Sequence, residues 1–424
     1  MDYKHRIADH ILQHRLQGKG AILIEGPKWC GKTTTAKQIA KSILDLGDSA
    51  VFENAETALQ VNPSVLLKGE PPQLIDEWQT LPALWDMVRS EVDRRQKFGQ
   101  FVLTGSSVPP SLDKIRHSGT SRIGRISMRP MSLWESGESA GTVSLGDLFD
   151  GAALSPQDSA LDLQQIAYLI CRGGWPQATL LEGSVALEEA RDYCEAIYKT
   201  DIHRIDDVRR SSIRTRLLLR SYARHQGCAV SYKRLSEDIK ENDNQSISYE
   251  TVSDYVEALR KLFVVEDMPA WNPNLRSRAV IMTSDTRYFI DSSIAAGVLA
   301  IGPQDLMNDL NTLGLLFETM AVRDLRVYAD ALSGDVFHFR DANGLECDAV
   351  LHRRNGTYGL IEIKLGGNNL IEKGAATLSK LAGKIDTDKM VPPSFMMVLT
   401  AVGAYAYQRP QDGVYVVPIG CLKP

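Results

Sequence analysis

The chain has 424 residues, of which 43% are hydrophobic and 24% charged, and its formal net charge is −5 at pH 7. This length predicts two or three domains, and the composition excludes a disordered or collagenous chain. The net charge provides no overall attraction to nucleic acid, so any DNA contact has to use local basic patches.

The sequence favours neither secretion nor insertion into a membrane. Its first residues, 1–6, are polar with no apolar segment after them, and no uninterrupted apolar run of about 18 residues occurs. The six cysteines are scattered, without a C-x-x-C pair, as in proteins that keep reduced thiols. We therefore expect a cytoplasmic protein with no membrane contact.

Short apolar strands alternate with helical segments in the first part of the chain. Strands are predicted at 21–24, 73–76 and 101–104, and helices at 32–44 and 84–94. This alternation predicts a parallel α/β sheet.

A phosphate-binding loop lies between the first predicted strand and helix. Residues 26–33 match G-x-x-x-x-G-K-[ST] in full, the pattern in which backbone N–H groups and a helix amino terminus face phosphates. We predict that it binds ATP with Mg²⁺, that Lys32 reaches the β- and γ-phosphates, and that Thr33 ligates the metal. Cys30 is interpreted as a small loop filler, with a redox-sensitive thiol as the alternative. The predicted nucleotide contacts are Gly26, Pro27, Lys28, Trp29, Cys30, Gly31, Lys32, Thr33 and Thr34.

Polar residues at the ends of the next two strands complete the predicted site. Asp76 is the expected partner of the metal, and Glu77 is the expected general base for the attacking water. Thr104 and Ser106 are candidates to sense the γ-phosphate, with Ser106 preferred. The alternatives are an unrelated acidic pair and an ordinary turn at the end of a strand.

A basic run without acidic residues follows. Arg122 and Arg125 are candidates to act as an arginine finger on the γ-phosphate of a neighbouring subunit. The alternative is a solvated or DNA-facing patch. The run contains Lys114, Arg116, Arg122, Arg125 and Arg129.

Helices dominate the middle of the chain. After a Gly/Ser/Glu-rich stretch at 135–155, helical spacing at 161–171, 185–198 and 213–225 predicts a lid behind the nucleotide sheet, followed by a linker. Seven arginines between Arg204 and Arg224, against Asp206 and Asp207, form a second basic patch. They are interpreted as phosphate contacts, or alternatively as a solvated helix face with internal Asp–Arg pairs.

Two further helices and a hairpin have the outline of a winged helix-turn-helix. The helices are expected at 231–239 and 248–263, and the strands from 264 and at 285–290. The second helix carries Glu250, Asp254 and Glu257 beside Arg260 and Lys261, and an acidic face makes poor contact with phosphates. Protein contacts and subunit packing are therefore alternatives to DNA binding for this element.

The last part combines a helix at 313–328 with β segments at 336–340, 347–352 and 358–364. Asp348 is followed fourteen residues later by Glu362-Ile363-Lys364, and side chains two apart on a strand share one face. Two carboxylates can hold Mg²⁺ while a lysine orients or deprotonates water, and Glu318 on the helix is a candidate to complete the site. This D…E-x-K arrangement resembles the nuclease motif. The alternatives are a chance E-x-K on a strand and a fold that only clamps DNA.

The motifs together resemble the AAA+-like ATPases of bacteria and archaea that carry a fused carboxy-terminal domain of long-unassigned role. The resemblance covers about residues 15–365. Besides the phosphate loop, the matching segments are 74–78 (LIDEW), 103–107 (LTGSS), 124–125 (GR), 129–135 (RPMSLWE), 171–176 (CRGGWP), 288–291 (YFID) and 314–318 (GLLFE).

The resemblance implies an α/β fold made of a P-loop AAA+ ATPase module with a helical lid (1–205), a winged helix-turn-helix domain (206–292) and a PD-(D/E)xK nuclease-like, restriction-endonuclease-like domain (293–424). Cys347 stands where the pattern more often has an aliphatic residue. We predict a homo-oligomeric ATPase, with a hexameric ring favoured, that couples Mg–ATP hydrolysis to binding, remodelling or processing of DNA such as branched or forked DNA. The alternatives are a nucleotide-switch ATPase whose tail binds a protein partner, and an active ATP-dependent nuclease.

Overall fold

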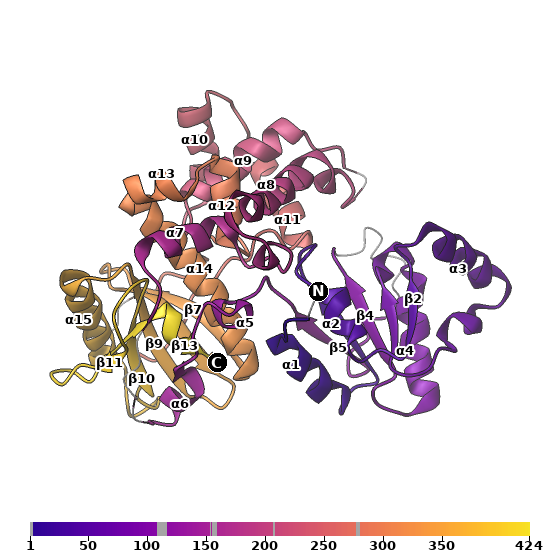
Figure 1. The fold of residues 1–424 in the computed structure, drawn as a ribbon, viewed down its shortest axis with the longest axis horizontal. Helices are drawn as coiled ribbons and strands as arrows, with labels where there is room; N and C mark the ends of the chain where they lie inside the picture. The colour runs from indigo at the N-terminus through magenta and orange to yellow at the C-terminus, as the bar shows by residue number, and fades with distance from the viewer. Residues whose placement is uncertain (1–2, 108–116, 153, 155–158, 207, 277–279) are drawn as a thin grey trace. The chain divides into compact units, whose positions relative to one another are not determined.

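The computed structural model describes residues 3–424 except 108–116, 153, 155–158, 207 and 277–279 (Figure 1). Lys114 and Arg116 of the first basic run and Asp207 lie outside the described residues. Contacts divide the chain into two compact units. The first unit comprises Met1–Arg129, Ile197–Arg210 and Glu257–Val264, and the second comprises Pro130–Ala196, Ser211–Val256 and Val265–Pro424. These units do not test the three predicted domains, which remain a prediction.

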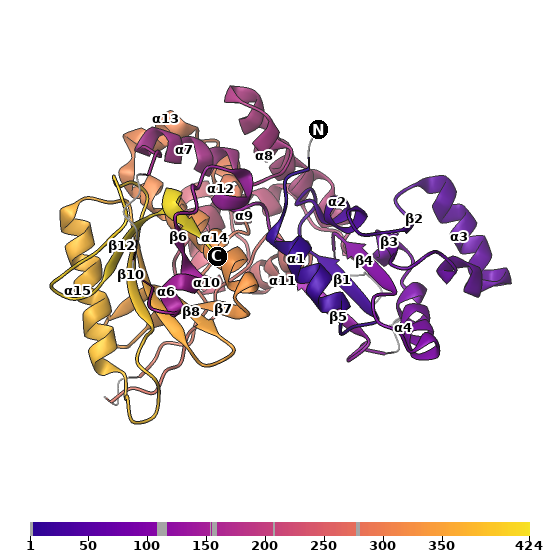
Figure 2. The same ribbon diagram turned by 60° about the horizontal axis from the view of Figure 1, so that its bottom comes forward.

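The first unit contains a five-stranded parallel sheet in the order β2-β3-β4-β1-β5. Both faces of the sheet are covered, which explains why its central strands are continuous apolar runs. α1 and α2 pack on one core that includes Leu12 and Ile24, while α3 and α4 pack on another that includes Trp85 and Leu103 (Figure 2). Its strands are β1 (Ala21–Glu25), β2 (Ser42–Asp45), β3 (Gln73–Asp76), β4 (Phe101–Gly105) and β5 (Ile123–Ser127), and its helices are α1 (Ile7–Leu16), α2 (Lys32–Lys37), α3 (Ser49–Val61) and α4 (Ala83–Arg95), with 3-10 turns η1 (Pro63–Leu67) and η2 (Trp78–Thr80).

The helix predicted at 32–44 is wrong in its second half. α2 ends at Lys37, and Ser42–Asp45 forms the edge strand β2. β2 pairs in parallel with β3, with Asp45 opposite Asp76. Pairing with a strand thirty residues away overrides the local helical pattern, because tertiary contacts outweigh helix propensity in a short segment.

The second unit contains a six-stranded mixed sheet in the order β11-β12-β10-β9-β8-β7. β7, β8 and β9 are antiparallel neighbours, whereas β9, β10 and β12 run parallel. α15 (Asn368–Lys384) covers one face with Ala375, Leu378 and Leu381, and α14 (Leu310–Ala331) is the longest helix of the described chain. The strands are β7 (Gly334–Arg340), β8 (Glu346–Arg353), β9 (Tyr358–Lys364), β10 (Phe395–Thr400), β11 (Tyr407–Gln408) and β12 (Tyr415–Pro418), which include the three that the sequence predicted.

Along the chain, the residues between the strands of the first sheet and those of the second are mostly helical, as predicted. At the predicted wing, the described residues form two isolated antiparallel bridges, Val265 with Phe289 and Met268 with Thr286, in place of the predicted strands. Within the Gly/Ser/Glu-rich stretch, β6 pairs in parallel with β13. The elements are α5 (Leu133–Ser136), β6 (Val143–Ser144), α6 (Leu145–Phe149), α7 (Leu163–Arg172), η4 (Ala178–Leu180), α8 (Gly183–Lys199), η5 (Asp201–His203), α9 (Ser212–Arg224), α10 (Tyr232–Asp243), α11 (Tyr249–Lys261), α12 (Ser292–Leu299), α13 (Pro303–Asn308), η6 (Ile419–Cys421) and β13 (Leu422–Lys423).

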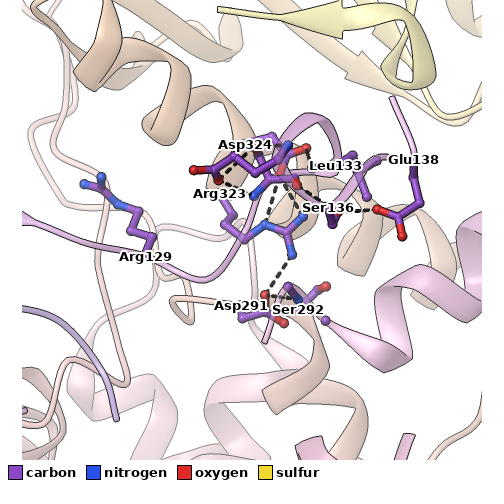
Figure 3. A network of polar contacts seen from close by, with 12 residues as sticks. Arg129, Leu133, Ser136, Glu138, Asp291, Ser292, Arg323 and Asp324 are labelled. Carbon is purple, nitrogen blue, oxygen red and sulfur yellow. Dashed lines mark hydrogen bonds and ion pairs between the residues drawn. The ribbon is translucent and has the colours of Figure 1, made fainter. Parts of the chain in front are cut away.

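A buried polar network connects distant segments of the second unit (Figure 3). Arg323 on α14 forms ion pairs with Asp291 at 2.8 Å and with Asp324 at 2.7 Å, and all three side chains are almost completely buried. Asp324 accepts a hydrogen bond from the Leu133 backbone N–H at 3.0 Å, and Asp291 accepts one from the Gly174 N–H at 3.0 Å. Three of the segments that resemble the AAA+-like family therefore meet at one junction.

None of the helices in the described parts of the chain combines the length and the apolar character needed to span a bilayer.

Candidate functional site

The phosphate loop leaves the central strand β1 through backbone conformations that require small residues. Gly26 has φ +155°, and a Cβ there would lie 2.1 Å from the Met128 carbonyl oxygen. Gly31 caps α2 with φ +101°, in the left-handed region that favours glycine. The glycines of the motif are thus needed for the shape of the loop.

Lys32 and Thr33 hold the positions expected of a phosphate-binding helix start. The Lys32 side chain is buried, and its Nζ donates to the carbonyls of Gly26 at 2.9 Å and Pro27 at 2.6 Å. The Thr33 hydroxyl donates to Asp76 Oδ1 at 2.9 Å. Thr34 is exposed. An ammonium inside the loop and a hydroxyl against a carboxylate are groups suited to a triphosphate and its metal.

Asp76 and Glu77 lie where β3 ends, at the same sheet edge as the phosphate loop. Asp76 accepts hydrogen bonds from Thr33, from the Thr104 hydroxyl and from the Glu77 N–H. Glu77 accepts a hydrogen bond from Ser106 Oγ at 3.1 Å. Thr104 therefore contacts the metal-site candidate, whereas Ser106 contacts the candidate base.

The sequence patterns did not identify two residues that lie at this edge of the sheet. Asp45 ends β2 opposite Asp76, and Gln79 Nε2 donates to Glu77 and lies 3.5 Å from Ser106 Oγ. The predicted helix ends at Leu44 and leaves Asp45 outside any strand, although Ile43-Leu44-Asp45 repeats the apolar-apolar-Asp ending of β3. No sequence signal identified Gln79, because its role follows from the turn η2 that brings it back onto Glu77.

Buried contacts support the phosphate loop from outside the motif. Arg6 donates from one guanidinium nitrogen to the Cys30 carbonyl at 2.7 Å and from another to the Arg129 carbonyl at 2.8 Å. The Cys30 side chain is fully buried, and its thiol donates to the Met128 carbonyl at 3.4 Å. This packing fits the interpretation of Cys30 as a loop filler.

Of the two candidate finger arginines, Arg125 is the middle residue of β5 and Arg122 directly precedes the strand. Arg125 forms an ion pair with Glu25 at 3.0 Å, immediately before the loop. Burial raises the pKa of Glu25, while the charge of Arg125 opposes this shift. Arg122 pairs with Asp93 at 2.8 Å and lies beside the start of β1, at the edge away from the loop. Both are half-exposed, and their action on a neighbouring subunit remains a prediction.

A contact with a distant segment holds Lys28 of the loop. Its Nζ lies 2.5 Å from Asp201 Oδ1, and both residues belong to the first unit. The sequence contained no signal for this pair, which joins residues 173 positions apart.

In the second unit, Asp348, Glu362 and Lys364 converge as the D…E-x-K spacing predicted. Lys364 Nζ lies 2.8 Å from Asp348 and 2.7 Å from Glu362. Burial lowers the pKa of the Lys364 ammonium, but the charges of both carboxylates outweigh this and raise it. Burial and the nearby Asp348 raise the pKa of Glu362.

Glu318 approaches the same group from α14. Tyr288 donates a hydrogen bond to Glu318 Oε1 at 2.5 Å. Burial, together with the charge of Asp348, raises the pKa of Glu318 well above its ordinary value. The charge of Asp348 therefore acts on both Glu318 and Glu362.

Two hollows meet at Asp348. An open one of about 430 Å³ is bounded by Asp348, Glu362, Lys364 and, on α15, Thr377 and Lys380. A much smaller one contains Tyr288, Glu318 and His338. Among the residues that the structure describes, no three His, Cys, Asp or Glu side chains are arranged as a metal-ligand set.

The first unit has the parallel sheet and the phosphate loop of a P-loop ATPase core. Residues 18–136 match the family described as AAA domain, which supports the P-loop ATPase core predicted from the sequence. Residues 163–305 match a Domain of unknown function (DUF8612), and residues 313–422 match a Domain of unknown function (DUF4143).

Individual relatives are distant. The chain is 22% identical over 356 residues to an uncharacterized protein of Mycobacterium tuberculosis and to one of Mycobacterium bovis, and each alignment covers 83% of this chain and 72% of the relative. Among solved structures, the Walker-type ATPase of Pyrococcus abyssi is 14% identical with a TM-score of 0.42, covering 70% of this chain and 96% of that chain. The Hef helicase domain of Pyrococcus furiosus is 11% identical with a TM-score of 0.21, covering 89% and 79%.

Proposed function

We propose that the chain binds Mg–ATP at residues 26–33 and hydrolyses it. The observation that carries the proposal is the hydrogen bond from the Thr33 hydroxyl to Asp76, beside a buried Lys32 ammonium within the loop. Backbone N–H groups of the loop and the start of α2 would face the phosphates.

The residues at this edge fit a magnesium ion. Mg²⁺ prefers oxygen ligands, and the Thr33 hydroxyl and the Asp76 carboxylate provide them next to the phosphate loop. Thr33 would ligate the metal directly, and Asp76 would hold it from the side of β3. When bound, Mg²⁺ supplies positive charge that stabilises the phosphate oxygens.

Glu77 is proposed to accept the proton of the attacking water. Ser106 and Gln79 donate hydrogen bonds to its carboxylate, so they would orient it. Lys32 would stabilise charge on the β- and γ-phosphates. In this arrangement binding and bond cleavage depend on different residues.

The test separates binding from hydrolysis. Calorimetry with Mg–ATP and an assay of phosphate release would be performed on the wild type, Lys32→Ala and Glu77→Gln. We expect Lys32→Ala to lose binding, and Glu77→Gln to keep it while its turnover falls by about 100-fold or more. Glu362→Gln in the second unit serves as a control that leaves both quantities unchanged. Absence of Mg–ATP binding by the folded wild type, or normal turnover by Glu77→Gln, would refute the proposal.

We further propose that ATP turnover is coupled to DNA. The support is the cluster of Asp348, Glu362 and Lys364 beside an open hollow, together with the arginines of α9. Arg220 and Arg224 of α9 pair with Asp243 and are engaged within the unit, so phosphate contacts would have to come from other arginines of that stretch. The competing proposal is a nucleotide switch whose tail binds a protein.

DNA dependence can be measured directly. Stimulation of turnover by duplex or branched DNA that falls steeply as salt rises would support the coupling, because phosphate contacts release counterions. Absence of DNA binding at low salt would end it and favour the protein-partner alternative. Cleavage that requires Mg²⁺ or Mn²⁺ and disappears in Asp348→Asn would establish a nuclease.

A ring assembly, with six subunits favoured and Arg125 or Arg122 acting in trans, is proposed on the resemblance alone. Mass measurement of the protein with a non-hydrolysable ATP analogue tests it. A monomer at micromolar concentration would contradict it.

A further inference from the structure

The ion pair between Lys28 and Asp201 links the phosphate loop to a segment far along the chain. The two charged atoms lie 2.5 Å apart. The Asp201 side chain is 7% exposed, whereas the Lys28 side chain is 38% exposed. One partner is therefore held inside the protein and the other reaches it from the loop.

Packing fixes the position of Asp201. It begins the turn η5 directly after α8, and its backbone carbonyl accepts a hydrogen bond from the Arg204 N–H at 3.0 Å. Ile202 in the same turn and Ile205 just after it are buried. Lys28, by contrast, has a long flexible side chain that extends from the loop predicted to surround the phosphates. If the pair separates, the lysine is the partner that moves.

The pair places a negative charge next to a site proposed to bind a more strongly negative ligand. A buried carboxylate is costly unless a cation accompanies it, so Lys28 stabilises Asp201. A triphosphate presents several negative charges and competes for the same ammonium. Lys28 cannot satisfy both anions fully.

We infer that Asp201 is a positioning residue of the nucleotide site, which shares Lys28 with the phosphates of bound ATP. Binding of nucleotide draws Lys28 from Asp201 and changes the stability of residues 201–206. The inference rests on the proposed ATP binding and assigns a partner that lies outside the phosphate-loop motif.

The experiment combines affinity with hydrogen exchange in the full-length protein. Asp201→Asn removes the charge and keeps the shape, and it is expected to tighten Mg–ATPγS binding by about two- to fivefold, as for a half-exposed ion pair. In the wild type, Mg–ATPγS is expected to change exchange of the amides at 201–206. In Asp201→Asn and in Lys28→Met this response to nucleotide disappears.

A matched ion pair in the second unit provides the control. Lys384 lies 2.8 Å from Asp341, with side-chain exposures of 23% and 0%. Lys384→Met is expected to leave both the affinity and the exchange response at 201–206 unchanged.

The outcomes are distinguishable. If the wild type binds Mg–ATPγS but the exchange at 201–206 does not respond, or if Asp201→Asn and Lys28→Met leave that response intact, Asp201 is only structural and the inference is overturned. If the wild type binds no nucleotide, the proposed function fails and the inference fails with it. Since Lys28 is half-exposed, Lys28→Met tests the inference even where Asp201→Asn does not fold.

Discussion

Replacing Arg323 with methionine removes the cation that pairs with both Asp291 and Asp324 in the buried network of the second unit. Methionine fills a similar volume, so packing along α14 is largely preserved while the guanidinium is lost. Arg323 is 1% exposed and both aspartates are 0% exposed, so no solvent can replace it. We expect a large loss of stability confined to this unit.

The magnitude follows from the two carboxylates left behind. Breaking a buried pair by removing one partner costs about 3–5 kcal/mol, and here two anions lose the same cation. Arg326, one turn further along α14, offers a matched comparison, because its partner Glu266 is 31% exposed and lies 3.5 Å away. Arg326→Met should therefore cost only about 1 kcal/mol.

The stability loss caused by Arg323→Met should increase as the pH rises. Burial raises the pKa of Asp324 from 3.8 to about 6, while the charge of Arg323 opposes the rise. Because the folded state holds this proton more tightly than the unfolded state, Asp324 lowers the stability as pH rises from about 4 to 6. Without Arg323 the pKa of Asp324 rises further. The stability lost in Arg323→Met should therefore be smallest at about pH 4.5 and largest at about pH 8.

Hydrogen exchange of the α14 amides measures the local opening free energy without assuming that the whole chain unfolds in one step. Calorimetry with Mg–ATP on the same protein checks that the first unit is intact. A loss below about 1 kcal/mol at pH 8, or a loss equal to that of Arg326→Met, would show that the network does not depend on the Arg323 charge.

Three further changes test other parts of the structure. Gly26→Ala would place a Cβ 2.1 Å from the Met128 carbonyl oxygen. The resulting strain of roughly 1–3 kcal/mol should lower the Mg–ATP affinity measured by calorimetry at least about tenfold. Unchanged affinity would contradict the described loop. Ser106→Ala removes the hydrogen bond to Glu77, so kcat should fall about tenfold with little change in nucleotide affinity, and an equal fall in affinity would place Ser106 in binding instead. The pKa of Glu362 is raised to about 8, mainly by burial, so this residue lowers stability as pH rises from about 4.5 to 8. In urea unfolding, the free energy of unfolding of Glu362→Gln relative to the wild type should rise by on the order of 2 kcal/mol between pH 5 and 8.5. A constant difference would show that ionisation of Glu362 does not destabilise the fold.

Local patterns were sufficient for the nucleotide loop and most helices. Gly26, Gly31, Lys32 and Thr33 lie in one short segment whose glycines and flanking strand dictate its conformation. The spacing of Asp348, Glu362 and Lys364 likewise predicted their convergence, because adjacent antiparallel strands bring alternating side chains together. Periodicity and spacing depend only on residues that are close together in the sequence.

Interactions between distant residues could not be read in this way. The edge strand β2, the contact between Gln79 and Ser106, the Lys28–Asp201 pair and the Arg323 network each depend on segments that are far apart in the sequence. A carboxylate's partner is decided by which side chains share its buried surroundings, not by its neighbours along the chain. The amino-acid order by itself therefore determined the phosphate loop and the alternation of elements, whereas packing of the folded chain decided which charges meet around them.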